Sequence, residues 1–268
     1  MKVTINSRPE NIDACENLES LKKRFSPLAD LIIINGFPAE KDTPIKENDE
    51  IIFIKKNTPP TFEEFEYMLT ARHTPKIHKK LKNASVAIGG LGGLGSNAAV
   101  SLARMGIGRL KLVDFDTVEP TNLNRQHYFI PQIGMKKTDA LAETVARVNP
   151  FIKIEKADIL VTNRNICEIF SGFDVILECF DNKNTKAMFT GEVLKKLPNS
   201  FLIGASGVAG VFSHKLFQTK PLGKSCVIIG DFENEAAEGM GLMATRAAIA
   251  ANIQANIAVR HILGEGND

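Results

Sequence analysis

A glycine-rich turn is the first feature of this 268-residue chain that could do chemistry. An apolar run at 85–89 leads into Gly90-Leu-Gly92-Gly93-Leu-Gly95, and a helix is expected from Ser96. Glycine at 90 permits a tight turn, glycine at 92 lets the backbone approach a phosphate, and glycine at 95 lets helix and strand pack closely. The helix N-terminus offers unpaired N–H groups to an anion. Because Asp114 ends the next strand, the pattern predicts a nucleotide site; the alternative is a purely structural turn.

The elements around this turn alternate between buried strands and helices, which predicts an α/β fold. We expect strands at 85–89, 109–114, 151–157, 174–179 and 200–204, and helices at 94–105, 137–148, 163–170 and 184–197. This order predicts a Rossmann-like, doubly wound, mostly parallel sheet with right-handed crossovers. Further strands at 207–212, 214–218 and 226–231 are expected at one edge. A last helix at 241–263 would place Ile249, Ile253, Ile257 and Ile262 on one stripe.

Residues 1–57 have the pattern of a separate small module. Strands are expected at 2–6, 31–34 and 51–54 and a helix at 16–25, with Asn35-Gly36 as a hairpin signal. This order resembles the ubiquitin-like β-grasp of the ThiS sulfur carriers. Thr58-Pro59-Pro60 marks the boundary, because consecutive prolines end the strand. A helix at 61–72 follows, which could pack on its own domain or on a neighbouring subunit.

The stretch after the second strand of the larger domain carries a longer motif. It runs Asp114-Phe-Asp116-Thr-Val-Glu-Pro-Thr-Asn122-Leu-Asn-Arg125-Gln126, and Gly134-Met-Lys-Lys137-Thr and Cys179-Phe-Asp181-Asn182 follow it. Together with the glycine turn, it resembles the ThiF, MoeB and HesA adenylyltransferases of the ubiquitin-activating-enzyme-like superfamily. The likeness spans most of residues 81–263. With the N-terminal module, the chain is most similar to ThiF carrying a fused ThiS-like domain. It implies three parts: a ThiS-like domain at 1–57, a linker and helix at 58–80, and an ATP-binding domain at 81–268.

The resemblance implies roles for individual residues. Asp114 would accept hydrogen bonds from the ribose, Arg125 and Lys137 would grip phosphate oxygens, and Asn122 would help to orient them. Asp181 would hold Mg²⁺, and Asp116 lies beside this group. The set of candidate nucleotide-binding residues is Gly90, Gly92, Gly93, Gly95, Asp114, Asp116, Asn122, Arg125 and Lys137. The candidate catalytic residues are Arg125, Lys137, Asp181 and Arg72.

Each of these residues also has an ordinary structural explanation. Asp114 could be a turn residue at a strand end, Arg125 and Lys137 could be solvated surface charges, and Asp181 could cap a helix ahead of Asn184. Lys136 precedes Lys137, so the phosphate contact is ambiguous by one position. Lys186 stands where many relatives have arginine, which keeps the charge but loses the bidentate fork.

Arg72 is the best match for an arginine that family members receive from the partner subunit of a homodimer. The alternative is an exposed arginine that ends a helix. If Arg72 crosses to a neighbouring pocket, the protein is a homodimer with shared active sites.

Composition and charge narrow the class of protein. With 33 basic and 31 acidic residues and 44% hydrophobic residues, the chain is typical of soluble globular proteins, so we expect neither nucleic-acid nor membrane binding and a cytoplasmic location. The four cysteines stand singly at 15, 167, 179 and 226. No Cys-x-x-Cys pair occurs, so zinc is not expected, nor a covalent thioester link.

The predicted function is ATP-dependent adenylation of the C-terminal glycine carboxylate of a ThiS-like sulfur carrier, in thiamine (thiazole) synthesis. Activation of another ubiquitin-like sulfur carrier, for molybdopterin or cysteine synthesis, is the alternative within the class. An NAD-dependent oxidoreductase would have no use for the Arg125, Lys137 and Asp181 set, and a non-catalytic carrier-binding scaffold would lose it. The N-terminal module lacks a free terminal carboxylate, since Lys55-Lys56-Asn57 continues into the prolines. A separate carrier is therefore expected.

Overall fold

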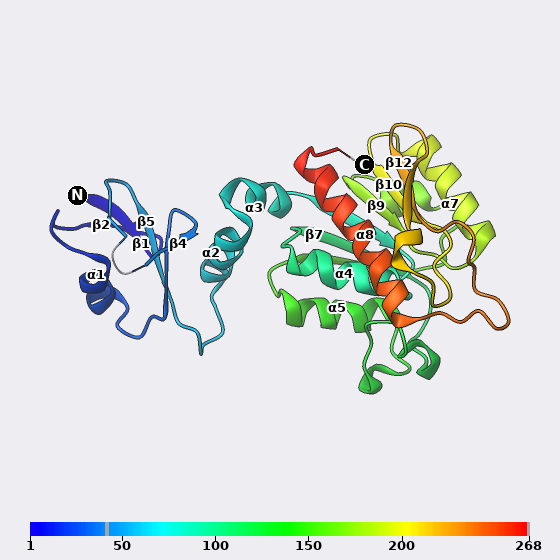
Figure 1. The fold of residues 1–268 in the computed structure, drawn as a ribbon, viewed down its shortest axis with the longest axis horizontal. Helices are drawn as coiled ribbons and strands as arrows, with labels where there is room; N and C mark the ends of the chain where they lie inside the picture. The colour runs from blue at the N-terminus through cyan, green and yellow to red at the C-terminus, as the bar shows by residue number, and fades with distance from the viewer. Residues whose placement is uncertain (41–42, 267–268) are drawn as a thin grey trace. The chain divides into compact units, whose positions relative to one another are not determined.

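The structure of the protein, a computed structural model, describes residues 1–40 and 43–266 (Figure 1). The chain divides into two units, Met1–Lys79 and Lys80–Asp268. Helix α3 (Pro75–Lys82) contains the division.

The first unit is a five-stranded sheet with a helix on each face, in the strand order β2-β1-β5-β3-β4. Its elements are β1 (Lys2–Ile5), β2 (Arg8–Asn11), α1 (Leu18–Phe25), β3 (Leu31–Ile34), β4 (Phe37–Pro38), β5 (Glu50–Ile54) and α2 (Phe62–His73). β1 and β5 are parallel and the other pairs antiparallel. β5 is buried on both faces: Ile51 and Phe53 pack with α1, whereas Ile52 and Ile54 pack against Tyr67 of α2. The β-grasp prediction is confirmed.

The sequence of this unit predicted the tight turn correctly but missed two short elements. The predicted hairpin joins β3 to β4, and Asn35 and Gly36 both have positive φ, 51° and 80°. The sequence pattern missed β2, because Arg8-Pro-Glu-Asn lacks the apolar alternation of a strand, and it missed α3, which begins at Pro75. Helix α2 packs on the sheet of its own unit, which settles its surroundings in this chain.

The second unit is a seven-stranded sheet in the order β11-β12-β10-β9-β6-β7-β8, all parallel except β11. Its strands are β6 (Ser85–Gly89), β7 (Arg109–Asp114), β8 (Lys153–Asp158), β9 (Val175–Glu178), β10 (Phe201–Ala205), β11 (Gln218–Pro221) and β12 (Cys226–Gly230). Helices α4 (Gly95–Arg104), α5 (Lys137–Val148) and α8 (Ala244–Leu263) cover one face, and α6 (Ile166–Phe170) and α7 (Lys183–Lys196) pack together on the other (Figure 1). The doubly wound sheet is confirmed. Its strand order reverses between β6 and β9, where such folds form their ligand crevice.

The predictions failed mainly after β10. Residues 207–212 were predicted as a strand but form an irregular loop, and the predicted strand at 214–218 is instead a short 3₁₀ turn, His214–Leu216, before β11. The predicted isoleucine stripe does not define the buried side of α8. Ile257 is buried, but Ile249 is 40% exposed, and Gln254 and most of the alanines of this helix are buried. Within the part of the chain that the structure describes, no helix combines the length and apolarity needed to cross a bilayer.

Candidate active site

A cavity of 810 Å³ opens at the carboxyl ends of β6, β7 and β9. The glycine turn and residues that follow β7 and β9 line one part of it. Residues 206–209, 234–236 and 242 line another part. The cavity therefore brings together segments more than a hundred residues apart in the sequence, at the place where parallel sheets bind ligands.

The glycine turn is constrained by backbone contacts as well as by its conformation. Gly90 has φ +89°, and a Cβ there would lie 2.7 Å from the carbonyl oxygen of Cys179. At Gly95, the first residue of α4, a Cβ would lie 1.9 Å from the carbonyl oxygen of Gly90. Any larger residue at either position would push apart the turn, the helix and strand β9. Gly92 and Gly93 line the cavity itself.

Asp114 ends β7, and its side chain holds the glycine turn in place. Its carboxylate accepts from Leu91 N at 2.6 Å and from Asp116 N at 2.9 Å. Each oxygen can accept a further hydrogen bond, and Asp114 lines the cavity. Lys137, at the start of α5, is buried, and its Nζ lies 2.8 Å from Asp116 Oδ2. Asp114, Asp116 and Lys137 thus form one charged cluster on the wall of the cavity.

The structure separates the two adjacent lysines. Lys137 lines the cavity, whereas the Lys136 amine pairs with Asp158 at 3.2 Å and the residue is not part of the lining. Lys136 is the residue before α5 and Lys137 is its first. The local geometry favours Lys137 as the residue that meets phosphate.

Arg125 lies directly over the glycine turn. A Cβ on Gly93 would be 3.5 Å from Arg125 Cγ. Its guanidinium donates to Thr121 O at 3.1 Å and to Asn124 Oδ1 at 2.8 Å, and no carboxylate among the described residues pairs with it. Its positive charge therefore remains available to an anion.

Asn122 is not brought into the cavity lining. Its side-chain oxygen accepts from Glu119 N at 3.0 Å, and its carbonyl accepts from Arg125 N and Gln126 N. These bonds hold the turn that presents Arg125. That Asn122 orients phosphate directly remains a prediction.

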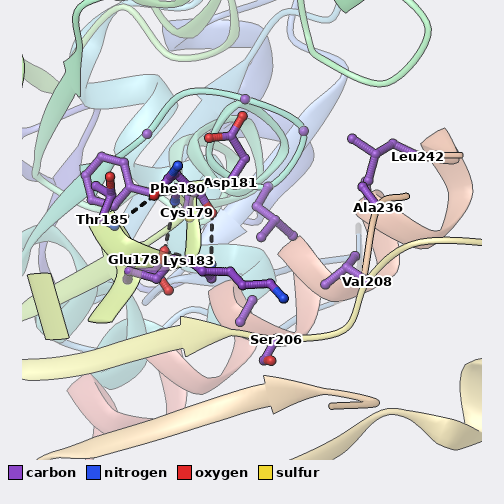
Figure 2. A pocket seen from close by; sticks show the side chains of 18 of the residues that line it. Glu178, Cys179, Phe180, Asp181, Lys183, Thr185, Ser206, Val208, Ala236 and Leu242 are labelled. Carbon is purple, nitrogen blue, oxygen red and sulfur yellow. Dashed lines mark hydrogen bonds and ion pairs between the residues drawn. The ribbon is translucent and has the colours of Figure 1, made fainter. Parts of the chain in front are cut away.

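The turn after β9 presents Asp181 to the cavity (Figure 2). The N-cap of α7 is Asn182, whose side-chain oxygen accepts from Asn184 N at 2.9 Å and Thr185 N at 3.1 Å. The capping role considered for Asp181 is thus taken by its neighbour. The carboxylate of Asp181 is exposed and makes no hydrogen bond or ion pair with another described residue.

A buried ion pair anchors the same turn. Glu178 Oε1 lies 2.8 Å from the Lys186 amine, which also donates to Phe180 O at 2.8 Å. Burial raises the pKa of Glu178, and Lys186 opposes that rise. Lys186 is therefore already engaged by protein groups, and Phe180 N donates to the same carboxylate at 2.9 Å.

Cys179 and Cys226 are buried. Burial, with the nearby Glu178 charge, raises the pKa of both thiols, that of Cys226 to about 11. Neither has the low pKa and exposure of a reactive thiol.

The loops after β10 and β12 form the remaining wall. Backbone bonds join them: Ala209 N donates to Asn234 O at 3.0 Å, and Gly210 N donates to Gly241 O at 2.8 Å. Buried Arg246 pairs with Asp231 and donates to Phe212 O at 2.8 Å. Figure 2 shows Val208, Ala236 and Leu242 across the cavity from Glu178, Cys179 and Phe180. Most of the side chains on this wall are small and apolar.

Most of the predicted site residues converge, and the structure adds others. Those that line the cavity are Gly90, Gly92, Gly93, Asp114, Asp116, Arg125, Lys137 and Asp181. Arg72 lies in the last turn of α2 in the first unit and is exposed, and its catalytic role stays a prediction. Sequence reasoning gave no role to Gln126 and missed Glu178 and the apolar run Ile159–Val161. The position of 159–161 just after β8 was the available signal, because ligands bind beyond the carboxyl ends of strands.

Comparison with known families agrees with this geometry. Residues 67–268 match the ThiF family, and residues 1–57 match the ThiS-like ubiquitin family. The chain belongs to the ThiF family. The predicted resemblance is confirmed in both parts of this ThiF-family protein.

Relatives of this ThiF-family protein have several activities. It is 32% identical over 201 residues to Drosophila virilis adenylyltransferase and sulfurtransferase MOCS3, which covers 70% of this chain and 42% of the relative. It is 41% identical over 121 residues to Arabidopsis thaliana ubiquitin-like modifier-activating enzyme 5, covering 39% of this chain and 28% of that one. It is 35% identical over 148 residues to the tRNA threonylcarbamoyladenosine dehydratase of Bacillus subtilis, covering 54% and 57%. The matched part of the chain spans 28% to 57% of the length of these relatives.

Solved structures show the same fold. The E. coli tRNA N6-threonylcarbamoyladenosine dehydratase TcdA, in complex with AMP, has a TM-score of 0.67 and 22% identity, and covers 74% of this chain and 93% of that chain. An ATP complex of TcdA gives the same TM-score, with 21% identity. At these identities the likeness establishes the fold alone.

Proposed function

We propose that this ThiF-family protein uses ATP to adenylate the C-terminal glycine carboxylate of a separate ThiS-like sulfur carrier, in the synthesis of the thiamine thiazole. The observation that carries the proposal is the 810 Å³ cavity, in which a glycine turn, a carboxylate at a strand end and two cations face one space. The name of the MOCS3 relative, adenylyltransferase and sulfurtransferase, supports the reaction class.

In this proposal the nucleotide phosphates lie over Gly92 and Gly93, and Asp114 accepts from the ribose hydroxyls. The carrier carboxylate attacks the α-phosphorus: a carboxyl O–P bond forms, the P–O bond to the leaving group breaks, and pyrophosphate departs. Arg125 and Lys137 stabilise the charge that accumulates on the phosphate oxygens. Neither residue transfers a proton in this step, because the attacking group is already a carboxylate.

Mg²⁺ fits the residues present. Mg²⁺ is commonly held by one or two carboxylates together with substrate phosphates and water, so a site made only of protein ligands is not required. In the described chain no group of three or more His, Cys, Asp or Glu side chains is arranged to hold a metal. The unpartnered carboxylate of Asp181 would supply the protein ligand, and the bound ion would neutralise phosphate charge.

The N-terminal module is proposed as a carrier-shaped domain that is not the substrate. Its last strand, β5, continues through Lys55 and Lys56 into α2, so the module has no free carboxylate. Helix α2 also packs against Ile33, Ile52 and Ile54, on the sheet face opposite α1. In this proposal the adenylated carboxylate therefore belongs to another molecule.

A homodimer with shared sites completes the proposal. Arg72 is exposed in the last turn of α2 and follows the acidic first turn of that helix. Arg72 of the partner subunit would add a third cation to the phosphates.

Carrier-dependent ATP–pyrophosphate exchange tests the function. Purified ThiS-type and molybdopterin-type carriers should be compared, each with a control that lacks the final glycine. We expect exchange with the intact ThiS-type carrier and none without it. Exchange with only the molybdopterin-type carrier would assign the protein to that pathway and not to thiazole synthesis. No exchange with any carrier would refute the proposed function.

A companion experiment tests the N-terminal module. Radiolabelled ATP incubated with this chain alone should leave no acyl-adenylate on it. Mass spectrometry that shows cleavage near Asn57 and AMP on the new C-terminus would overturn the assignment of a separate carrier.

The likeness to tRNA threonylcarbamoyladenosine dehydratases supports a second candidate, a tRNA nucleoside as the substrate. The matched ThiS-like module favours the carrier. Exchange that is stimulated by tRNA bearing threonylcarbamoyladenosine, and not by any carrier, would favour the second candidate.

A further inference from the structure

Tyr128 follows the Asp114–Gln126 motif and has no part in the proposed mechanism. The residue is 5% exposed, and its hydroxyl donates to Leu91 O, in the glycine turn, at 2.8 Å. Among the described residues, Tyr128 is the only donor to this carbonyl. The N–H of Leu91 donates to the Asp114 carboxylate at 2.6 Å. Leu91, which is fully buried, is therefore held from both sides.

The next two carbonyls of the glycine turn are held in the same way, by the first turn of α4. Gly92 O accepts from Ser96 Oγ at 2.7 Å, and Gly93 O accepts from Asn97 Nδ2 at 2.7 Å. Three successive carbonyls of the turn therefore bind side-chain donors. Of these three donors, only Tyr128 comes from a distant segment of the chain.

The N–H groups of these peptide units point the opposite way from their carbonyls, because the peptide bonds are trans. Holding Leu91 O therefore fixes the direction of Gly92 N–H. The N–H groups of residues 92, 93 and 94 have no acceptor among the described residues, and all three residues line the cavity. Successive backbone N–H groups of this kind form a concave site that attracts anions. The anchored carbonyls thus leave a row of N–H groups available to phosphate.

The Leu91–Gly92 peptide needs a fixed donor because it can rotate. Turning this peptide over changes ψ of Leu91 and φ of Gly92, and glycine populates φ of either sign at little cost. The turned peptide would present the Leu91 carbonyl oxygen, with its partial negative charge, in place of Gly92 N–H. Burial raises the pKa of Tyr128, and the charges of Asp114 and Asp116 raise it further, so the hydroxyl stays protonated and continues to donate.

We propose that Tyr128 is a positioning residue for the nucleotide phosphates, because its hydroxyl holds the Leu91–Gly92 peptide with Gly92 N–H directed to the ligand; this inference rests on the proposed use of ATP. Tyr128 does not touch the nucleotide and acts through the backbone. Its contribution is confined to ligands that carry phosphate, since the ribose lies at Asp114. Loss of the hydroxyl therefore lowers the preference for a nucleotide over its nucleoside.

Tyr128→Phe removes the hydroxyl and keeps the ring. The full-length protein is titrated with a non-hydrolysable ATP analogue and, separately, with adenosine. Tyr128→Phe should bind the ATP analogue about tenfold more weakly than the wild type, the size of effect expected for one hydrogen bond. It should bind adenosine within about twofold of the wild type, the range that an unchanged nucleoside site allows. A distortion of the whole cavity would weaken the binding of both ligands alike.

The other tyrosine of the chain provides the matched control. Tyr67 lies in the first unit, where its hydroxyl bonds to the Glu50 carboxylate. Tyr67→Phe also removes one hydroxyl hydrogen bond, and it should retain the wild-type affinities for both ligands. The comparison separates the loss of a tyrosine hydroxyl in general from the loss of the contact with Leu91.

NMR can follow the Leu91–Gly92 peptide itself. Labelling with carbonyl-¹³C leucine and ¹⁵N glycine selects the Leu–Gly peptide bonds of the chain, which are at 91–92, 94–95, 222–223 and 263–264. The Gly92 resonance is identified by its loss in Gly92→Ala. In the wild type it should shift with the ATP analogue and much less with adenosine. In Tyr128→Phe it should move already in the free protein and respond less to the analogue.

Equal affinities of Tyr128→Phe and the wild type for the ATP analogue would overturn the inference, as would an equal loss for the analogue and for adenosine. A wild-type Gly92 resonance that does not move with the analogue, or that moves as far with adenosine, would overturn it even if Tyr128→Phe did not fold. The carrier-dependent exchange assay is independent of these titrations. The expected affinities without any exchange would leave Tyr128 as a positioning residue while the proposed reaction fails, whereas exchange together with unchanged binding by Tyr128→Phe would remove Tyr128 alone.

Discussion

Replacing Lys137 with Met removes one cavity charge while keeping an unbranched side chain of similar length. The Lys137 residue is 7% exposed, so the unbranched Met side chain can fill the space that the lysine stem occupies. Asp116, left without its partner at 2.8 Å, has a side chain 47% exposed and can be solvated. The fold should therefore survive. Lys136→Met is the matched control, because it removes an adjacent charge that pairs with Asp158 outside the cavity lining.

The size of the effect follows from the position of the amine. A unit charge about 4 Å from another contributes about 4 kcal/mol at an effective dielectric constant of about 20. The Asp116 carboxylate, 2.8 Å from the Lys137 amine, already offsets part of its positive charge. The loss of transition-state stabilisation should therefore be smaller than about 4 kcal/mol. Removing one charge-stabilising donor typically costs about 10² to 10³ in rate. We expect carrier-dependent exchange to fall about 10²-fold, which corresponds to about 2.7 kcal/mol.

The assay is ATP–pyrophosphate exchange at saturating carrier, with ATP affinity measured separately by direct titration. Lys136→Met should stay within about twofold of the wild type, the range expected for a surface ion pair. If Lys137→Met matched the control, Lys137 would have no part in charge stabilisation. If Lys136→Met lost more activity than Lys137→Met, the assignment would be off by one residue.

Three further perturbations address the rest of the site. Asp181→Asn keeps the size of the side chain and removes its charge, so it should raise the Mg²⁺ concentration needed for half-maximal exchange; an unaltered titration curve would remove Asp181 from metal binding. Mixed dimers of Arg72→Ala and Arg125→Ala chains should recover part of the activity that each parent lacks, since one hybrid site carries neither change, and verified mixed dimers without recovery would disprove the shared site. Iodoacetamide at neutral pH should alkylate the two exposed cysteines of the native protein and spare the two buried ones, whose pKa values are raised; rapid labelling of a buried cysteine would contradict this assignment. The exposed pair is Cys15 and Cys167, and the buried pair is Cys179 and Cys226.

Local pattern was sufficient for much of the larger unit. Strands β6 and β7 and helix α5 match their predicted ranges residue for residue. Buried parallel strands and amphipathic helices are encoded by periodicity within a few residues. The glycine turn was also predicted from the sequence, and the structure shows that a Cβ at Gly90 or Gly95 would collide with backbone.

Other features depend on residues far apart in the sequence. Strand β12 was predicted, but the loops after β10 and β12 contain no sufficient local signal, since they are held by Arg246 of α8 through Asp231 and Phe212 O. The sequence left open whether helix α2 packs on its own unit or on another subunit. In the structure it packs on the face of β5 that carries Ile52 and Ile54.

The sequence alone determined the family, the two folds and the position of the phosphate turn, because glycine geometry, strand periodicity and the Asp114–Gln126 motif are local properties. The tertiary structure decided which side chains face the cavity. It placed Lys137 and not Lys136 on the cavity wall, since successive residues of a helix point about 100° apart. It assigned the helix cap to Asn182, which leaves Asp181 without a partner among the described residues. Such outcomes depend on how distant segments pack, and no local pattern encodes them.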